Sequence, residues 1–309
     1  MPAGADPVPM HRQDWALLVL LSVLWGGSFF FNGVALRELP PLTVAFVRVG
    51  GGALCLLAVI GALGDRLPRR PIDWLPFGVM GLLNNVIPFS LFLVAQTIIS
   101  SGLAAVLNAT TPLFAVLVMA ATGEERLTAR RIAGVLIGIG GVAILRAPGL
   151  SVSAQLTGIA LCLLAALSFG LAGYWGRRAL TGVPPLTSAA GQLVCSTMMM
   201  AVIAGFADHP WTLPLPGATT WAALLGLTTV STALGYVLFF RILNRSGAVN
   251  VMLVTLLIPV TTILLGHFVL GEALTLREIA GALVIAASLL VIDGRVLDWV
   301  RPAGRAKKA

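Results

Sequence analysis

The stretch PPLTVAFVR, residues 40–48, decides how this chain is organised. It places an arginine inside an otherwise apolar run, and its first four letters return as PPLT at residues 184–187. Aligning the two copies sets Arg48 opposite Gln192. Two features therefore need an explanation: the repeated segment and the charge inside it.

The composition around this stretch is that of a membrane protein. Of 309 residues, 58% are hydrophobic and only 10% are charged, and the mean hydropathy is +0.97; soluble chains carry about 25% charged residues. The chain contains apolar stretches that are each long enough to cross about 30 Å of hydrocarbon as a helix. They cover residues 15–36, 41–63, 74–97, 101–121, 128–146, 155–176, 185–206, 217–241, 247–270 and 275–293. We therefore expect an all-α polytopic membrane protein with ten transmembrane helices.

The positive charges are distributed unevenly over the segments between these spans. With a cytoplasmic N-terminus, only Arg37, Arg146 and Arg277 fall on the outer side, and Arg48 lies within a span. The cytoplasmic side then receives Arg12, Arg66, Arg69, Arg70, Arg126, Arg130, Arg131, Arg177, Arg178, Arg241, Arg245, Arg295, Arg301, Arg305, Lys307 and Lys308. The positive-inside rule thus predicts that both termini are cytoplasmic. We expect the plasma membrane, which is the inner membrane in a bacterium, as the location. The net charge of +8 reports this orientation, and no nucleic-acid partner is expected.

Two further markers support an internal duplication. Pro112 and Pro259 are separated by nearly the same offset as the two PPLT segments, and LTARRIAG from residue 127 matches LTLREIAG from residue 274. The dipeptide GE, ending at Glu124 and at Glu272, comes just before the second match but is one residue out of phase. Three ordered markers at nearly one offset predict two homologous halves.

The predicted halves are residues 10–146 and 155–293, each with five helices, followed by a basic cytoplasmic tail at 294–309. Because five is odd, the second half enters the membrane from the opposite side, so the halves are inverted repeats. Inverted repeats are typical of alternating-access transporters, whose site lies near the midplane where the repeats meet. Channels and membrane enzymes also contain repeats, so this pattern favours transport without excluding them.

Longer segments carry a family resemblance. They are WGGSFFFNGVALRELPPLTVAFVRVGGGAL (25–54), AAVLNATTPLFAVLVMAATGEERLTARRIAGVLIGIGGVAIL (104–145) and VMLVTLLIPVTTILLGHFVLGEALTLREIAGALVIAASLL (251–290). The chain resembles the EamA-type family of the drug/metabolite transporter superfamily over nearly its whole length. This resemblance implies two EamA repeats, a central cavity, and peripheral packing of the fifth and tenth helices. It also implies export of amino acids or other small metabolites.

Matching prolines point to a binding site. Pro112 and Pro259 each remove the hydrogen bond to the carbonyl four residues earlier, at Asn108 and Thr255, which are themselves equivalent positions. Paired helix interruptions are the best sequence indication of a transporter site. Asn108, Thr111 and Thr255 are therefore candidate substrate-binding residues. The alternative is a packing kink stabilised by local bonding of Asn and Thr side chains.

The third and eighth spans, which are equivalent, hold further polar candidates. In the third span, Asn85, Phe89, Phe92 and Gln96 recur at helical spacing, and a polar helix face in lipid needs protein or water beside it. The candidates from these two spans are Asn84, Asn85, Phe89, Phe92, Gln96, Thr228, Ser231, Thr232 and Tyr236. Pro88 in the third span, Pro112 in the fourth and Pro259 in the ninth are the candidate hinges. Trp25, Ser28 and Asn32 form a similar stripe in the first span, and Tyr174 and Trp175 end the sixth. An aromatic and amide lining suits a small organic solute, although some of these aromatics serve packing or the membrane interface.

Arg48 has two interpretations. It lies about 10 Å below the outer end of its helix, at 1.5 Å per residue. It either snorkels outward to lipid phosphate or helix carbonyls, or it acts as a gate or a clamp for a substrate carboxylate.

Catalytic chemistry is not indicated. The acids all lie near span ends, and His11, His209 and His267 are scattered, so neither a catalytic cluster nor a buried proton relay is visible. Cys55, Cys162 and Cys195 lack CxxC spacing, so no metal, cofactor or disulfide is expected. The sequence therefore predicts a transporter of small organic metabolites in the lipid bilayer, with no obligatory protein partner evident. A polytopic membrane enzyme, or a carrier of sugar phosphates or drugs, is the alternative.

Overall fold

The computed structural model describes residues 11–64, 67–124, 128–145, 151–251, 253–272 and 275–293. Within these residues every regular element is helical. The α-helices are α1 (Arg12–Ala35), α2 (Pro41–Leu63), α3 (Leu75–Gly81), α4 (Ile87–Gln96), α5 (Ser101–Asn108), α6 (Thr111–Ala121), α7 (Ala129–Ile144), α8 (Val152–Ala179), α9 (Pro185–Ala207), α10 (Ala218–Leu225), α11 (Gly235–Val251), α12 (Val254–Leu265) and α13 (Leu276–Asp293). Short 3-10 helices are η1 (Pro71–Trp74) and η3 (Pro210–Thr212), and π-helical segments are η2 (Leu82–Val86), η4 (Gly226–Leu234) and η5 (Gly266–Leu270). The predicted tail at 294–309 lies outside the described residues.

Apolar helices dominate the fold, as predicted. Among the described residues, seven helical segments are long and apolar enough to cross a membrane. They are Arg12–Ala35, Pro41–Leu63, Pro71–Gln96, Ser101–Ala121, Val152–Ala179, Pro185–Ala207 and Ala218–Ser246, with a shorter apolar run at Val254–Leu270. The remaining predicted spans correspond to α7, which has 16 described residues, and to α13, which carries Arg277, Glu278 and Asp293.

The two PPLT segments start equivalent helices. Pro40 and Pro184 are the N-cap residues of α2 and α9, and Pro41 and Pro185 are the first helical residues. Proline suits the first helical position because its fixed φ matches the helix and its missing N–H has no intrahelical acceptor there. The repeated motif therefore marks the start of the second helix in each predicted half.

The prolines do not interrupt their helices in the same way. Pro112 is the second residue of α6, and the chain turns at Ala109–Thr110, after α5 ends at Asn108. Pro259 instead lies inside the continuous helix α12. The expectation of matching breaks is therefore correct for the first half, where the proline follows a real interruption, and wrong for the second.

The boundary between the eighth and ninth spans also differs from the prediction. The helix α11 runs past residue 241 to Val251, and the next helix starts at Val254. This segment contains no proline, and the side chain of Asn250 donates to the carbonyl of Ser246 at 2.8 Å within the helix. In the first half, by contrast, Ser100 caps a new helix by accepting from Leu103 N.

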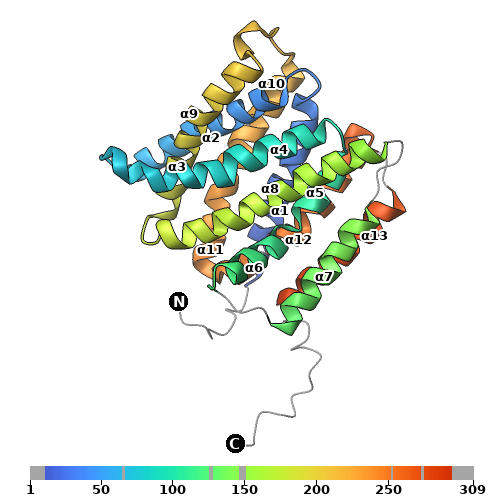
Figure 1. The fold of residues 1–309 in the computed structure, drawn as a ribbon. Helices are drawn as coiled ribbons and strands as arrows, with labels where there is room; N and C mark the ends of the chain where they lie inside the picture. Colours follow the sequence, from blue (N-terminus) through green and yellow to red (C-terminus); the bar gives the residue numbers. More distant parts are fainter. Residues whose placement is uncertain are drawn as a thin grey trace, which may run out of the picture.

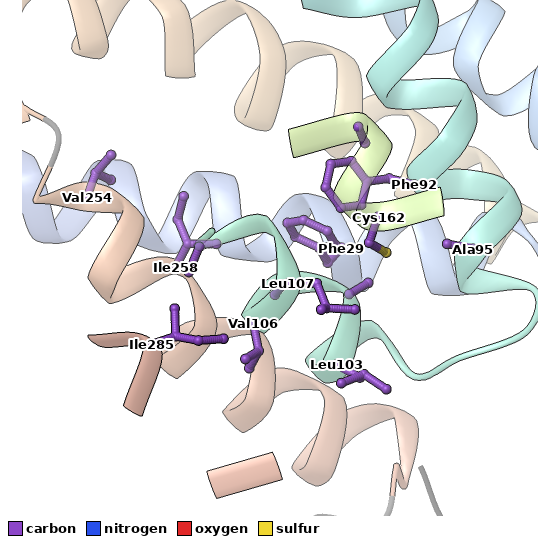
Figure 2. Packing of buried hydrophobic residues seen from close by; sticks show 14 of the residues in the cluster. Phe29, Phe92, Ala95, Leu103, Val106, Leu107, Cys162, Val254, Ile258 and Ile285 are labelled. Atoms are coloured by element: carbon purple, nitrogen blue, oxygen red, sulfur yellow. The ribbon is translucent and has the colours of Figure 1, made fainter. Parts of the chain in front are cut away.

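Two hydrophobic clusters form the interior. One joins α1, α4, α5, α8, α11, α12 and α13, and Figure 2 shows its side chains from both ends of the sequence packed together. The other lies between α2, α4, α9 and α10 with η4. Because each cluster draws on both predicted halves, neither half has a core of its own.

The helices α7 and α13 form a pair that lies along one side of the molecule (Figure 1). Small residues bring the two backbones together. A Cβ placed on Gly141 would lie 2.8 Å from Cγ1 of Ile285, 3.1 Å from its backbone nitrogen and 3.2 Å from the carbonyl oxygen of Gly281. Close backbone approach through small residues is the usual means of helix association in lipid.

Adjacent glycines allow this contact to be tested. Gly141→Ala should destabilise the protein by about 1–3 kcal/mol, because the new methyl group meets backbone atoms of α13 that cannot move aside singly. Gly140→Ala is the matched control, since its Cβ would meet nothing within 4 Å. Thermal unfolding in detergent should therefore show a lower midpoint for Gly141→Ala alone. Equal midpoints for the two variants would contradict close packing of α7 on α13.

Candidate functional site

Arg48 lies on α2 in the interior of the helix bundle. Its side chain is only 8% exposed, and its guanidinium carbon lies 3.8 Å from the centre of the Phe89 ring. Its Nε donates a hydrogen bond of 3.3 Å to the hydroxyl of Thr232. The alternative in which Arg48 snorkels outward does not describe this structure, because α4 and η4 supply its neighbours.

A set of amide and hydroxyl side chains connects η2 to α9 and α11. Asn84 donates through Nδ2 to Oε1 of Gln192 and to the hydroxyl of Tyr236, both at 3.0 Å. Tyr236 donates in turn to Oδ1 of Asn85 at 3.0 Å. Asn85 then donates to the hydroxyl of Ser196, also at 3.0 Å. We call these five residues the amide network.

The amide network and Arg48 belong to one region. Phe89 follows Asn85 by four residues, and Tyr236 follows Thr232 by four residues, so each pair lies on one face of its helix. Arg48 contacts one residue of each pair, Phe89 and Thr232. The region therefore combines a buried cation, uncharged donors and acceptors, and aromatic rings.

Two π-helical segments position these side chains. The segments η2 and η4 begin at Leu82 and Gly226, which correspond under the offset of the PPLT segments. In a π turn each carbonyl is directed to the amide five residues later, and such turns occur frequently at functional sites. The widened turns thus lie at equivalent places in the sequence, next to the amide network.

Hydroxyl groups satisfy equivalent carbonyls in these segments. Pro88 has no N–H to offer to Leu83, and the carbonyl of Leu83 accepts from the hydroxyl of Ser168 on α8 at 2.6 Å. At the equivalent position, the carbonyl of Leu227 accepts from the hydroxyl of Thr232 at 2.8 Å. Because the Thr232 proton is donated there, a lone pair of its oxygen is free to accept from Arg48.

A second polar group links α1, α4 and α5. Asn32 donates to Oε1 of Gln96 at 2.9 Å, and Gln96 donates to the carbonyl of Phe29 at 2.9 Å and to the hydroxyl of Ser101 at 3.0 Å. The Oδ1 atom of Asn32 is buried and has no hydrogen-bond partner among the described residues. Asn32 and Gln96, which the sequence placed in two different stripes, thus lie together, in a separate group from Asn84 and Asn85.

The aromatic candidates of the first and third spans pack within the bundle. Trp25 stacks on Phe239 at 5.3 Å between ring centres. Phe92 meets Phe29 edge to face at 5.5 Å and stacks on Phe169 at 6.2 Å. The latter three rings connect α1, α4 and α8 in the core.

Other predicted residues take local roles. The hydroxyls of Ser28 and Thr228 donate to the carbonyls of Trp25 and Leu225 in their own helices. The hydroxyl of Ser231 is buried without a hydrogen-bond partner among the described residues.

Asn108 and Thr111 bond to one another across the turn between α5 and α6, at 3.4 Å. Thr255 lies at the start of α12 and is partly exposed. None of the hydrogen bonds described above joins Asn108 or Thr111 to the amide network. The local-bonding alternative accounts for this pair in the first half.

Tyr174 and Trp175 lie near the end of α8, away from the amide network. Tyr174 accepts from Nη1 of Arg178 at 2.8 Å at the surface, and Trp175 donates to the carbonyl of Pro76 at 3.0 Å. Their prediction as site residues followed the aromatic composition, whereas Tyr174 bonds within α8 and Trp175 joins α8 to the start of α3.

Three residues near the site escaped the sequence-based selection. Gln192 was recognisable as the amide opposite Arg48 in the alignment. Ser168 and Ser196 gave no signal, because an isolated serine in an apolar span commonly bonds to its own helix. Their partners, the carbonyls of Leu83 and Gly81, are defined only by the fold.

Carboxylates close one end of the molecule. Asp208 accepts from the backbone N–H of Thr43 at 2.7 Å and from its hydroxyl at 3.0 Å, and Glu38 accepts from Gly217 N at 2.7 Å. Each acid caps the start of a helix in the other predicted half, where the helix dipole favours a negative charge. We call this region the Glu38 end.

Glu272 makes a third contact of the same kind. It accepts from the backbone nitrogens of Ser101 at 2.9 Å and Gly102 at 3.2 Å, at the start of α5. Nearby, Thr275 and Glu278 bond reciprocally as the box that starts α13. Backbone amides at helix starts otherwise lack partners, so these contacts fix the helices against one another.

At the equivalent place in the opposite end of the molecule, a pocket of about 450 Å³ lies between the start of α3, the end of α8 and the start of α9. Its lining includes Asp73, Gly182 and Thr187. The hydroxyl of Thr187 is buried there and has no hydrogen-bond partner among the described residues. We call this region the Thr187 end.

The described residues hold no group of three or more His, Cys, Asp or Glu side chains that could bind a metal. The three cysteines are free thiols. The chemistry available around Arg48 is therefore that of binding a solute through hydrogen bonds, one positive charge and aromatic surface.

Comparison with known proteins assigns the chain to a family. An EamA-like transporter family model matches residues 14–147 and again 156–293. A crystal structure covering 94% of this chain, and itself covered completely, superposes with a TM-score of 0.66 at 19% identity. At that identity the likeness concerns the fold alone.

Curated relatives agree with the family model. An uncharacterized transporter of Archaeoglobus fulgidus is 27% identical over 91% of this chain and 98% of its own length. A protein of Salmonella typhimurium named "Probable amino-acid metabolite efflux pump" is 28% identical over 91% and 95%. An uncharacterized inner membrane transporter of Escherichia coli is 29% identical over 92% of both chains. With both matches of the family model covering most of its length, the chain belongs to the EamA-like transporter family and is a membrane transporter.

Proposed function

We propose that the protein exports amino acids or closely related small metabolites across the bacterial inner membrane, by alternating access. The observation that carries this proposal is the amide network beside a buried arginine, in a chain whose relatives include proteins named as amino-acid metabolite efflux pumps. Uncharged amides and a phenol suit a polar solute that must be bound and released. A network of ordinary hydrogen bonds is exchangeable for solute contacts at small net cost.

The solute-binding residues of this proposal lie in the amide network and around it. They are Arg48, Phe89 and Thr232 together with the network itself. Asn32 and Gln96 form a second polar group, nearer the Glu38 end. Gln96 follows Asn85 by eleven residues, or about three helical turns. Buried polar atoms without partners, such as Oδ1 of Asn32 and Oγ of Ser231, are available to bind a solute or water.

The proposal includes ten membrane helices in two inverted repeats, residues 10–146 and 155–293, with cytoplasmic termini. Three observations support it: two consecutive matches to the family model, the equivalent starts of α2 and α9, and the equivalent positions of η2 and η4. The asymmetry of positive charge supports the orientation. In this orientation the Glu38 end is extracytoplasmic and the Thr187 end is cytoplasmic.

Alternating access is supported by the difference between the two ends. Under the repeat offset, Glu38, Thr43 and Gly217 correspond to Gly182, Thr187 and Asp73. The first three residues take part in the hydrogen bonds that close the Glu38 end, whereas the last three line the pocket at the Thr187 end. Inverted repeats permit the converse state, in which the outer end opens and the inner end closes.

Two alternatives are less well supported. A polytopic membrane enzyme would need positioned acids, bases or metal ligands, and the curated relatives above are named as transporters or efflux pumps. A carrier of sugar phosphates would need several cations around a doubly charged group. Arg48 is the one arginine or lysine that lies more than one helical turn from either end of a predicted span.

Reconstitution tests the function directly. Purified protein in liposomes should exchange radiolabelled amino acids from a panel of small, branched and aromatic members, above the rate of protein-free liposomes. The panel should be repeated with and without imposed ion gradients. Flux of no amino acid or related metabolite would overturn the proposed substrate class.

The chain contains two tyrosines, which provide a matched pair for testing the site. Tyr236→Phe should weaken solute affinity by about tenfold, because it removes a hydroxyl that makes two partly buried hydrogen bonds. Tyr174→Phe should leave affinity unchanged, since Tyr174 bonds to Arg178 at the surface. Concentration-dependent flux in liposomes measures both. Equal affinities of the two variants would remove the amide network from the binding site.

Cysteine labelling tests the orientation. In a background with Cys55, Cys162 and Cys195 replaced by serine, Leu215→Cys should react with an impermeant reagent in intact cells. Leu215 is 89% exposed and lies in the segment after α9. Thr181→Cys, in the segment before α9, should react only after the membrane is permeabilised. The reverse pattern would place the termini outside.

Cross-linking tests alternating access. A disulfide formed between Thr43→Cys and Asp208→Cys should arrest transport, because the Glu38 end could no longer open. Reduction should restore the rate to that of the unlinked double variant, and each single variant serves as a control for loss of the Asp208 hydrogen bonds. Full transport by the cross-linked protein would show that this end does not need to open.

A further inference from the structure

We infer that Arg48 binds the carboxylate of the transported solute, an inference that rests on the proposed function and deepens it. Among the described residues, no carboxylate lies within ion-pair distance of its guanidinium. Its protein contacts are a single hydrogen bond to a neutral hydroxyl and the face of an aromatic ring. A buried charge in that situation is costly unless an anion joins it.

The edge of the Arg48 guanidinium that would bind an anion has no hydrogen-bond acceptor among the described residues. Phe89 covers one planar face of the guanidinium at 3.8 Å, and Thr232 accepts from Nε. The N–H groups of the two terminal nitrogens make no hydrogen bond to a described residue. Those groups form a planar fork that matches the two oxygens of a carboxylate. One planar face of the guanidinium and its Nε are therefore engaged by protein, whereas its two terminal nitrogens have no hydrogen-bond acceptor among the described residues.

The charge balance selects a carboxylate over a phosphate. One guanidinium neutralises one negative charge, whereas a phosphate monoester carries about two at neutral pH. The neighbouring amide network supplies only neutral groups around Arg48. A zwitterionic or singly anionic metabolite fits this arrangement, and its apolar part would meet the rings of Phe89 and Tyr236.

The position of Arg48 also argues against binding of a lipid headgroup. Arginines that bind lipid headgroups extend to the membrane surface. Arg48 is 8% exposed and lies between α2, α4 and η4. Its repeat counterpart Gln192 is an amide of the network, so the two equivalent positions both face polar chemistry in the interior.

Binding measured on the purified full-length protein in detergent tests the assignment. The probes are alanine, leucine and phenylalanine, each as the free amino acid, the amide and the N-acetyl derivative, with inorganic phosphate as a further arm. Wild-type protein should bind the free and N-acetylated forms about tenfold or more tightly than the amides. Arg48→Gln, which copies Gln192, should lose this preference, and Arg48→Lys should retain part of it.

The experiment distinguishes failure of the Arg48 inference from failure of the proposed transport function. Equal binding of acids and amides by wild-type protein, binding of none of the acids, or tighter binding of phosphate would each overturn the inference. So would a preference for acids that persists in a folded Arg48→Gln. If Arg48→Gln does not fold, a preference in Arg48→Lys equal to that of wild type overturns the bidentate contact. Amide flux in liposomes without preference for acids would leave the transporter proposal intact, whereas absent flux with preserved acid binding would overturn transport alone.

Discussion

The arrangement around Arg48 depends on hydrogen bonds from hydroxyl groups to two backbone carbonyls, those of Leu83 and Leu227. In lipid, a carbonyl freed from its helix has no water to bond to, so a widened turn persists only where the protein supplies a donor. Ser168 supplies it for η2, where Pro88 cannot. In η4 the hydroxyl of Thr232 adds a second donor to the carbonyl of Leu227, toward which the π turn already directs the Thr232 amide. The second of these bonds also orients Thr232 toward Arg48, so one hydroxyl serves both the backbone and the cation.

The sequence predicted the helical membrane fold and most of the polar interior, because both follow from local composition and from a repeat offset. It could not predict the grouping of the polar residues. Asn85 and Gln96 lie on one helical face, but eleven residues correspond to about 16 Å along the axis, and they join different groups. The choice of Ser196 and Gln192 as partners depends on how α9 packs against η2, which no local pattern specifies.

One irregularity of the repeat now has a structural cause. The GE dipeptides are one residue out of phase with the prolines before them and with the LT segments after them. Gly123 and Gly271 both adopt left-handed backbone conformations, with φ of 74° and 70°, so the two turns are equivalent. The π segment η5 lies directly before Gly271, and the equivalent helix α6 is regular. A π turn accommodates one extra residue in a helix, which accounts for the shift.

The departures from exact repetition are as informative as the repeat. Two identical inverted halves would give two end states of equal free energy, and any difference between them must come from positions where the halves differ. Glu38 faces a helix start at one end, whereas its counterpart Gly182 has no carboxylate to offer at the other. Arg48 likewise places its charge on one side of the repeat axis, opposite the neutral Gln192. Under the proposed mechanism, the first difference favours closure of the outer end in the empty protein. The charge difference between Arg48 and Gln192 makes the affinity for an anion unequal in the inward-open and outward-open states. A solute shifts the equilibrium between two states only through such a difference in affinity.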